Sequence, residues 1–111
     1  MAWYDDANGW VATKYNVLFS AVSDAEASAP TEQVIEAYQK QLEILKMVAY
    51  DVLDWQRAVA RRDILQTNID AEHVSPETIA TAQAEIQKLG VEIAYIELKT
   101  KLNQMLYKVT I

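Results

Sequence analysis

The single histidine of this sequence, His73, is the first residue to test for chemistry, because imidazole titrates near neutral pH and binds metals. Ser75 lies two residues later, so the pair resembles a nucleophile beside a general base. The serine, however, precedes Pro76 and Glu77, which is the pattern of a helix N-cap. A solvated loop histidine beside a capping serine explains both residues, and we predict that neither is catalytic.

Metal and cofactor chemistry needs residue types that this sequence lacks. The chain has no cysteine, which excludes zinc fingers, iron–sulfur sites, disulfides and thiol nucleophiles. A di-iron helical bundle needs Glu-x-x-His on two helices, and one histidine cannot supply both. Two glycines are too few for a Walker loop or a dinucleotide-binding fingerprint. The sequence therefore predicts a protein that is not an enzyme, with no catalytic residue, no metal and no cofactor.

The charged residues indicate which partners we expect. Sixteen acidic and ten basic side chains give a formal net charge of −6. An acidic chain repels phosphate backbones, so we expect no nucleic-acid binding. The one basic cluster, Arg57, Arg61 and Arg62, lies close in sequence to Asp54 and Asp63. We predict a solvated face of ion pairs there rather than an anion site.

We expect neither a membrane span nor a cleavable leader. No apolar run approaches the ~20 residues that cross a bilayer. The first six residues contain two aspartates and neither a cationic segment nor a long apolar one, unlike a signal peptide. We therefore expect synthesis in the cytoplasm, with any export following a route that reads no cleavable signal.

The composition and the hydrophobic spacing predict an all-α protein with two long amphipathic helices. Two glycines and two prolines among 111 residues are too few for a turn-rich β fold. Pro30 ends a small polar stretch, and Ser75-Pro76 marks a helix start. The expected single domain comprises an N-terminal segment with a short helix (1–22, helical from about 8), a linker (23–30), a long helix (31–69), a loop (70–75) and a long C-terminal helix (76–109).

Apolar residues in both long helices recur at steps of three and four, as in a coiled-coil seam. The stripes are Ile35, Tyr38, Leu42, Leu45, Ala49 and Val52 in the first, and Ile79, Ala82, Ile86, Leu89, Ile93 and Ile96 in the second. We interpret them as the facing seams of an antiparallel hairpin. A further apolar stripe in helix 31–69 indicates contact with more than one neighbour. Beyond Gly90 the stripe of the last helix drifts, which predicts either a bend or a change of packing partner.

The predicted helix lengths require an elongated helical hairpin or three-helix bundle. Helices of some thirty residues extend about 50 Å, whereas a compact domain of this size has a radius of gyration of about 13 Å. The short first helix covers only part of that length, so another copy or another protein must cover the rest. The predicted assembly or partner interface comprises Trp3, Tyr4, Trp10, Leu98, Leu102, Met105, Leu106 and Val109. For the three aromatic residues, the alternative is a staple that holds the N-terminal segment on the bundle.

Two helical segments also carry the pattern of a known family. The first is Ser75-Pro76-Glu77-Thr78-Ile79, followed by Gln83, Ile86, Leu89, Val91, Ile93, Leu98, Leu102 and Leu106-Tyr107-Lys108. The second runs from Ala29-Pro30 through Ala37-Tyr38-Gln39 to Leu42. Together with the early Trp3 and Asp5-Asp6, they resemble the axial proteins of type III secretion systems, which are needle and inner-rod subunits and their flagellar counterparts. The resemblance implies helical self-assembly into an extracellular conduit, with the C-terminal helix buried in the assembly and no catalysis.

Two functions of different kinds remain open from the sequence. The first is a non-catalytic structural subunit that self-associates through its long amphipathic helices, as a filament or rod subunit of a secretion apparatus does. The second is a small acidic adaptor, chaperone or phage-encoded inhibitor that binds one protein partner, since negative charge suits a basic target surface. Sedimentation of the purified protein across a range of concentrations distinguishes them, because only the first predicts self-association.

Overall fold

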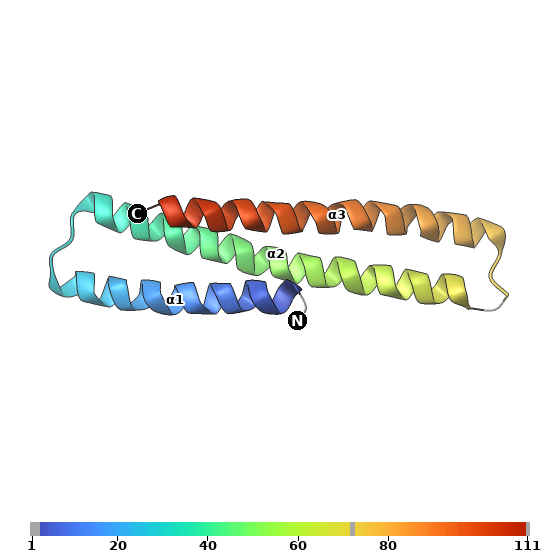
Figure 1. Cartoon of the computed structure of the whole chain (residues 1–111), viewed down its shortest axis with the longest axis horizontal. Helices are drawn as coiled ribbons and strands as arrows, with labels where there is room; N and C mark the ends of the chain where they lie inside the picture. Colours follow the sequence, from blue (N-terminus) through green and yellow to red (C-terminus); the bar gives the residue numbers. More distant parts are fainter. Residues whose placement is uncertain (1–2, 72, 111) are drawn as a thin grey trace.

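Three α-helices form the described part of the chain, in the order α1 (Trp3–Ala27), α2 (Glu32–Asp70) and α3 (Pro76–Val109). The structure is a computed structural model that describes residues 3–71 and 73–110, so residues 1–2 of the predicted N-terminal segment and residue 72 of the predicted loop lie outside it. Successive helices run antiparallel, and α2 lies between the other two (Figure 1). The predicted all-α class is confirmed.

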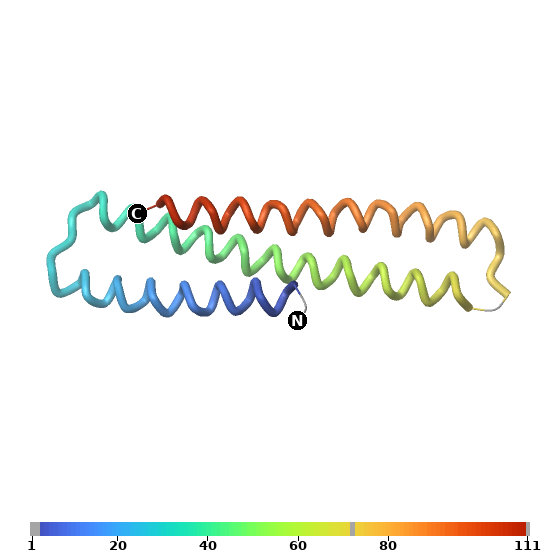
Figure 2. Tube along the Cα trace, viewed as in Figure 1, coloured from blue at the N-terminus to red at the C-terminus, as the bar shows by residue number. Residues whose placement is uncertain are grey.

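The molecule is a rod. Its extents are 68 × 20 × 16 Å, and its Cα radius of gyration is 19.7 Å, well above the ~13 Å of a compact domain of this length. The helices α2 and α3 form a hairpin over almost the full length, whereas α1 accompanies only the N-terminal half of α2 (Figure 2). The predicted elongation is confirmed, and the other half of the hairpin has no third helix beside it among the described residues.

Both long helices begin where the sequence indicates. Thr31 precedes α2 with an extended backbone, and its Oγ1 accepts a hydrogen bond from the Val34 N–H at 3.3 Å. Ser75 precedes α3 in the same conformation and accepts from the Thr78 N–H at 3.2 Å, with Pro76 in the first turn. Such caps satisfy amide groups that no carbonyl of the helix can reach. The observed bounds consequently lie within one residue of those predicted.

The first helix begins earlier than the predicted residue 8. It starts at Trp3, and Gly9 lies inside it without a break. Trp3 and Tyr4 pack on Trp55 of α2, with ring centroids 5.1 and 5.9 Å apart. These aromatic contacts hold the first turn of α1 in place. They join residues some fifty positions apart in sequence, so local signals for a helix start could not predict them.

The predicted linker over 23–30 is also wrong, because α1 continues to Ala27. The segment is small and polar, but its alanine, aspartate and glutamate residues are all compatible with a helix. The chain turns only after it, where Ala29 has a φ of 49°. The connection between α1 and α2 is therefore shorter than predicted and consists of residues 28–31.

The main seam of the rod lies between α2 and α3, and it repeats at steps of three and four along both helices. On α3 the buried and half-buried members are Ile79, Ala82, Ile86, Leu89, Ile93, Ile96, Thr100, Asn103 and Tyr107. On α2 they are Gln41, Ile44, Val48, Asp51, Trp55, Ala58, Arg62, Leu65 and Ile69. Within residues 3–71 and 73–110, side-chain pairs that join the two helices are Asp51 with Lys99, Trp55 with Glu97 and Arg61 with Glu85.

The predicted partner stripe on α2, residues 35–52, lies between the seam to α3 and α1. Its members Tyr38 and Leu45 pack with Leu18 and Trp10 of α1, in a cluster that also contains Tyr107 of α3. The interpretation of two facing seams was correct for α3, and for α2 it placed the seam too far toward α1. The prediction for α2 was misled because the observed α2 seam contains glutamine, aspartate and arginine, whereas the neighbouring stripe is more apolar.

The predicted drift at Gly90 has a different explanation from the two considered. The helix α3 runs through Gly90 without interruption (Figure 1), and its seam to α2 stays in step through Thr100, Asn103 and Tyr107. The leucines beyond Gly90 belong to a second stripe on the opposite face. Polar residues in the seam hid its continuation, so neither a bend nor a change of partner is needed.

Candidate assembly surfaces

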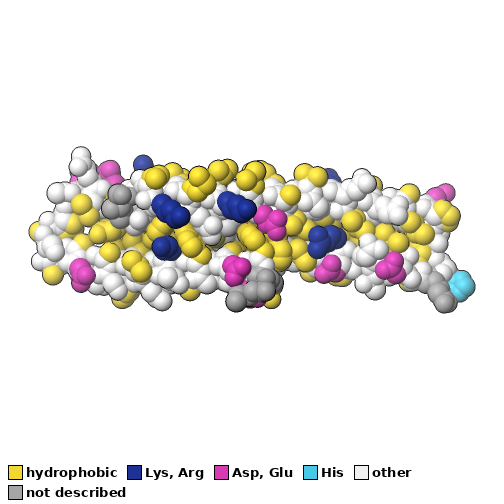
Figure 3. All heavy atoms as spheres, in the orientation of Figure 1, with side chains coloured by type: hydrophobic (Ala, Val, Ile, Leu, Met, Phe, Trp, Pro, Cys, Tyr) yellow, Lys and Arg dark blue, Asp and Glu magenta, His cyan; other side chains and the backbone are white. Residues whose placement is uncertain are grey.

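An apolar stripe runs along the outer face of α3, and its last member, Val109, also lines a hollow beside α2. Its members are Val91, Tyr95, Leu98, Leu102, Met105 and Val109, each more than half exposed. At 3.6 residues per turn, this series lies roughly 180° around the helix from the seam to α2. Figure 3 shows hydrophobic side chains along this edge of the rod, with Lys or Arg side chains beside them. We call these six residues the α3 stripe.

Four of the predicted interface residues, Leu98, Leu102, Met105 and Val109, belong to the α3 stripe, and Leu106 lies beside it. None of the five is in the core of the single chain, since their exposed fractions run from 52% to 76%. The alternating steps of three and four are what a second helix needs for knobs-into-holes packing. Sequence reasoning missed Val91 and Tyr95, which the same spacing identifies.

The three N-terminal aromatic residues of the predicted interface have neighbours within the chain. Trp3 and Tyr4 lie on Trp55, and Trp10 packs edge-on against Tyr107 of α3 with ring centroids 5.3 Å apart. Each of the three is half-buried. These contacts fit the alternative interpretation, a staple that holds α1 on the hairpin. That the same residues also contact a partner stays a prediction.

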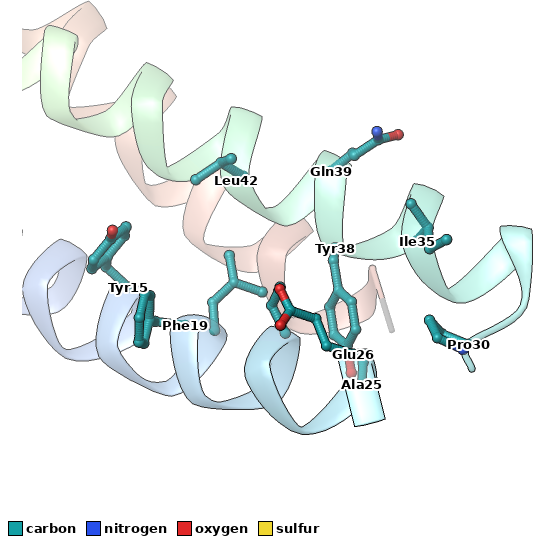
Figure 4. A pocket seen from close by; sticks show the side chains of 11 residues that line it. Tyr15, Phe19, Ala25, Glu26, Pro30, Ile35, Tyr38, Gln39 and Leu42 are labelled. Carbon is teal, nitrogen blue, oxygen red and sulfur yellow. The ribbon is translucent and has the colours of Figure 1, made fainter. Parts of the chain in front are cut away.

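A second apolar surface is the groove between α1 and α2, with a volume of about 550 Å³. Tyr15 and Phe19 of α1 line one side, and Tyr38 and Leu42 of α2 line the other (Figure 4). Glu26 is the one charged side chain among the lining residues. The sequence did not predict this groove, because it depends on how α1 lies against α2.

Polar side chains interrupt the α2–α3 seam near the C-terminal end of α3. The buried ones are Gln41, Asp51, Thr100 and Asn103. Lys99 Nζ lies 3.2 Å from Asp51 Oδ1. Asp51 Oδ2, Thr100 Oγ1 and Asn103 Nδ2 have no hydrogen-bonding partner among the described residues. Polar groups at single seam positions fix the register of paired helices at a cost in stability, and we interpret this layer in that way.

Thr100→Val is expected to stabilise the protein by about 1 kcal/mol. Thr100 is 1% exposed, and its hydroxyl has no partner among the described residues, so valine keeps the shape and removes a buried polar group. Urea unfolding followed by circular dichroism measures the change. Thr100→Ser keeps the hydroxyl, loses the methyl group and serves as the destabilised control. A less stable valine variant would show that the hydroxyl is satisfied in the folded protein.

Alkaline pH is expected to destabilise the protein through Tyr107. Burial raises the pKa of Tyr107 above its ordinary value of 10.0. As pH rises past 10, the unfolded chain therefore loses this proton before the folded one does, and the free energy of unfolding falls until the folded pKa is passed. We expect Tyr107→Phe to weaken this dependence. Urea unfolding at pH values on both sides of 10 tests it, and an unchanged pH profile in the variant would contradict it.

The three arginines are part of a face of ion pairs, as predicted. The Arg61 guanidinium contacts both carboxylate oxygens of Glu85 on α3, at 3.0 and 3.5 Å. Arg57 and Arg62 lie 3.5 and 3.9 Å from acidic neighbours on their own helix. All of these pairs are largely exposed, so each contributes little to stability.

Ser75 and His73 lie in the connection that precedes α3. Ser75 caps α3, and His73 lies in the preceding turn with a φ of 64°. Over residues 3–71 and 73–110, no three His, Asp or Glu side chains are grouped as metal ligands. None of the described helices is both long enough and apolar enough to span a membrane.

Comparison with known proteins adds no relative. No protein-family model, curated protein or solved structure matches the chain. A function must therefore be inferred from the two apolar surfaces, the α3 stripe and the groove between α1 and α2.

Proposed function

We propose that this protein is a non-catalytic assembly subunit that associates with copies of itself through the α3 stripe. The observation that carries the proposal is the six-residue apolar series on the face of α3 that its own hairpin leaves uncovered. Full burial of a large apolar side chain contributes roughly 1.5–3 kcal/mol, so covering the series gives a substantial driving force for association. An exposed apolar surface of this extent on a soluble protein marks an interaction site.

The rod shape supports the same proposal. Two helices of 39 and 34 residues present long, straight faces, and a third helix of 25 residues covers only part of them. Helix-on-helix packing between molecules extends such a bundle by the same contacts that build it. The resemblance to type III secretion axial proteins implies a filament or rod outside the cell, and this finer assignment stays a prediction from two sequence segments.

Sedimentation velocity over a wide range of protein concentrations tests the proposal. The wild-type sedimentation coefficient is expected to rise with concentration, while Leu102→Asp remains monomeric with its helix content intact. Ile64→Asp is the matched control, because Ile64 is also about half exposed but lies on α2, away from the α3 stripe. A wild type that is monomeric throughout would contradict self-association and favour the adaptor. An unaffected Leu102→Asp would exclude the α3 stripe as the interface.

A further inference from the structure

We infer that the α3 stripe of one copy seats in the groove between α1 and α2 of the next copy. This inference rests on the proposed self-association and names the surface that receives the stripe. The groove is open, and aromatic and aliphatic side chains line it almost entirely (Figure 4). The chain's own α3 cannot fill it, because α3 packs on α2 through its opposite face. The occupant must come from another molecule.

Charge complementarity identifies a second copy as the occupant. The segment 98–109, which carries most of the α3 stripe, contains no acidic residue and three lysines. Lys99 is paired with Asp51, so Lys101 and Lys108 are left for a partner. Glu26 is the charged side chain that lines the groove, and Asp24 and Glu32 lie close to it in sequence. Lysines on the stripe thus meet a carboxylate in the groove, which favours this encounter.

Pairing the segment 98–109 of one copy with the same segment of another is disfavoured by these lysines. It would bring together Lys101 and Lys108 of both copies, with no carboxylate in either segment to oppose them. Juxtaposed like charges penalise a wrong pairing even where the apolar contacts are good. The lysines therefore favour an apolar surface that carries a carboxylate over the same segment of a second copy, and the groove with Glu26 is such a surface on this chain.

The dimensions of the two surfaces agree. At about 1.5 Å per residue, the segment 98–109 is about 18 Å long. The α1 side of the groove, from Tyr15 to Glu26, has the same number of residues and the same length. A helix that places one apolar face in a groove of this kind is a common mode of recognition, with anchors three and four residues apart. Leu98, Leu102, Met105 and Val109 provide that spacing.

Head-to-tail contact has a consequence for the assembly. The two surfaces differ, so after the first contact one copy keeps a free stripe and the other keeps a free groove. Such an interface closes into a ring or continues as an open filament, and it does not stop at a two-fold dimer.

Mixing two interface variants tests the inference. Leu102→Asp places a charge in the α3 stripe, and Phe19→Asp places a charge in the groove. The Phe19 side chain is 62% exposed. We expect each variant alone to be monomeric and folded by circular dichroism, and an equimolar mixture to form a one-to-one heterodimer. The heterodimer arises because each variant retains the surface that the other has lost. Assembly of Phe19→Asp at the wild-type level, with Leu102→Asp monomeric, would overturn the inference and leave the proposed function standing.

Salt dependence gives a second, independent measurement. Raising NaCl from about 50 to about 500 mM screens the charges, so contact between the stripe and the groove is expected to weaken several-fold. Pairing of two copies of the segment 98–109 would instead strengthen, because salt relieves repulsion among their lysines. Association of the wild type that tightens with salt would overturn the inference. Failure of the wild type to associate at any concentration would contradict the proposed self-association itself.

Discussion

Val48→Asp is expected to unfold the isolated chain, whereas Leu102→Asp, which also puts a carboxylate in place of an apolar side chain, leaves it folded. Val48 has no exposed surface and lies in the α2–α3 seam. An unpaired carboxylate buried there costs several kcal/mol, a large part of the 5–15 kcal/mol that typically separates folded from unfolded domains. Thermal unfolding at low protein concentration, followed by circular dichroism, measures both variants.

The pair of variants also tests whether the α3 stripe belongs to the core. Val48→Ala serves as the milder control, since it removes methyl groups without adding charge and is expected to lower stability while leaving the chain folded. Cooperative unfolding caused by Leu102→Asp in the monomer would place the stripe in the core of the chain. Retention of a folded state by Val48→Asp would show that the seam admits water.

Trp55→Ala is expected to lower the free energy of unfolding by about 2–3 kcal/mol, less than for a fully buried tryptophan because Trp55 is half-buried. Trp55 joins all three helices, because Trp3 and Tyr4 of α1 pack on its ring and its indole N–H donates to Glu97 Oε1 of α3 at 3.2 Å. Its removal exposes the apolar surface that the ring covers and takes the indole donor away from Glu97. We also expect the first turns of α1 to fray, since these aromatic contacts hold them.

Urea unfolding measures the loss of stability, and hydrogen exchange of the amides in α1 measures the fraying. Tyr50→Ala is the control on the same helix, because Tyr50 is 58% exposed and makes none of these contacts. Equal losses in the two variants would contradict the structural role of Trp55. A large loss in Trp55→Ala without faster exchange in α1 would show that the aromatic contacts do not hold the first turn.

Local signals account for the parts of the fold that the sequence predicted well. Thr31 and Ser75-Pro76 act on backbone amides three residues away, so the starts of α2 and α3 are readable from short segments. The start of α1 depends on Trp55, and its end depends on small residues that suit both a helix and a linker. The facing α2 seam escaped prediction because Gln41 and Asp51 occupy core positions.

The α3 stripe was predictable in part, because steps of three and four identify a helix face without naming its neighbour. Leu98, Leu102, Met105 and Val109 were placed on the predicted interface by that spacing and lie exposed in the structure. The groove was not predictable from spacing. It requires Phe19 on α1 to lie near Leu42 on α2, and this proximity follows from the antiparallel packing of the two helices.

Disulfide trapping between single-cysteine variants tests the proposed head-to-tail contact most directly, because the chain has no cysteine of its own. Leu102→Cys marks the α3 stripe, Phe19→Cys marks the groove, and Ile64→Cys serves as an exposed control outside both. Each pair is mixed under mild oxidation, and the cross-linked species are identified by mass spectrometry. Head-to-tail contact predicts that the disulfide between positions 102 and 19 dominates in their mixture. A predominance of the disulfide between two copies of position 102, or cross-linking no greater than with position 64, would contradict it.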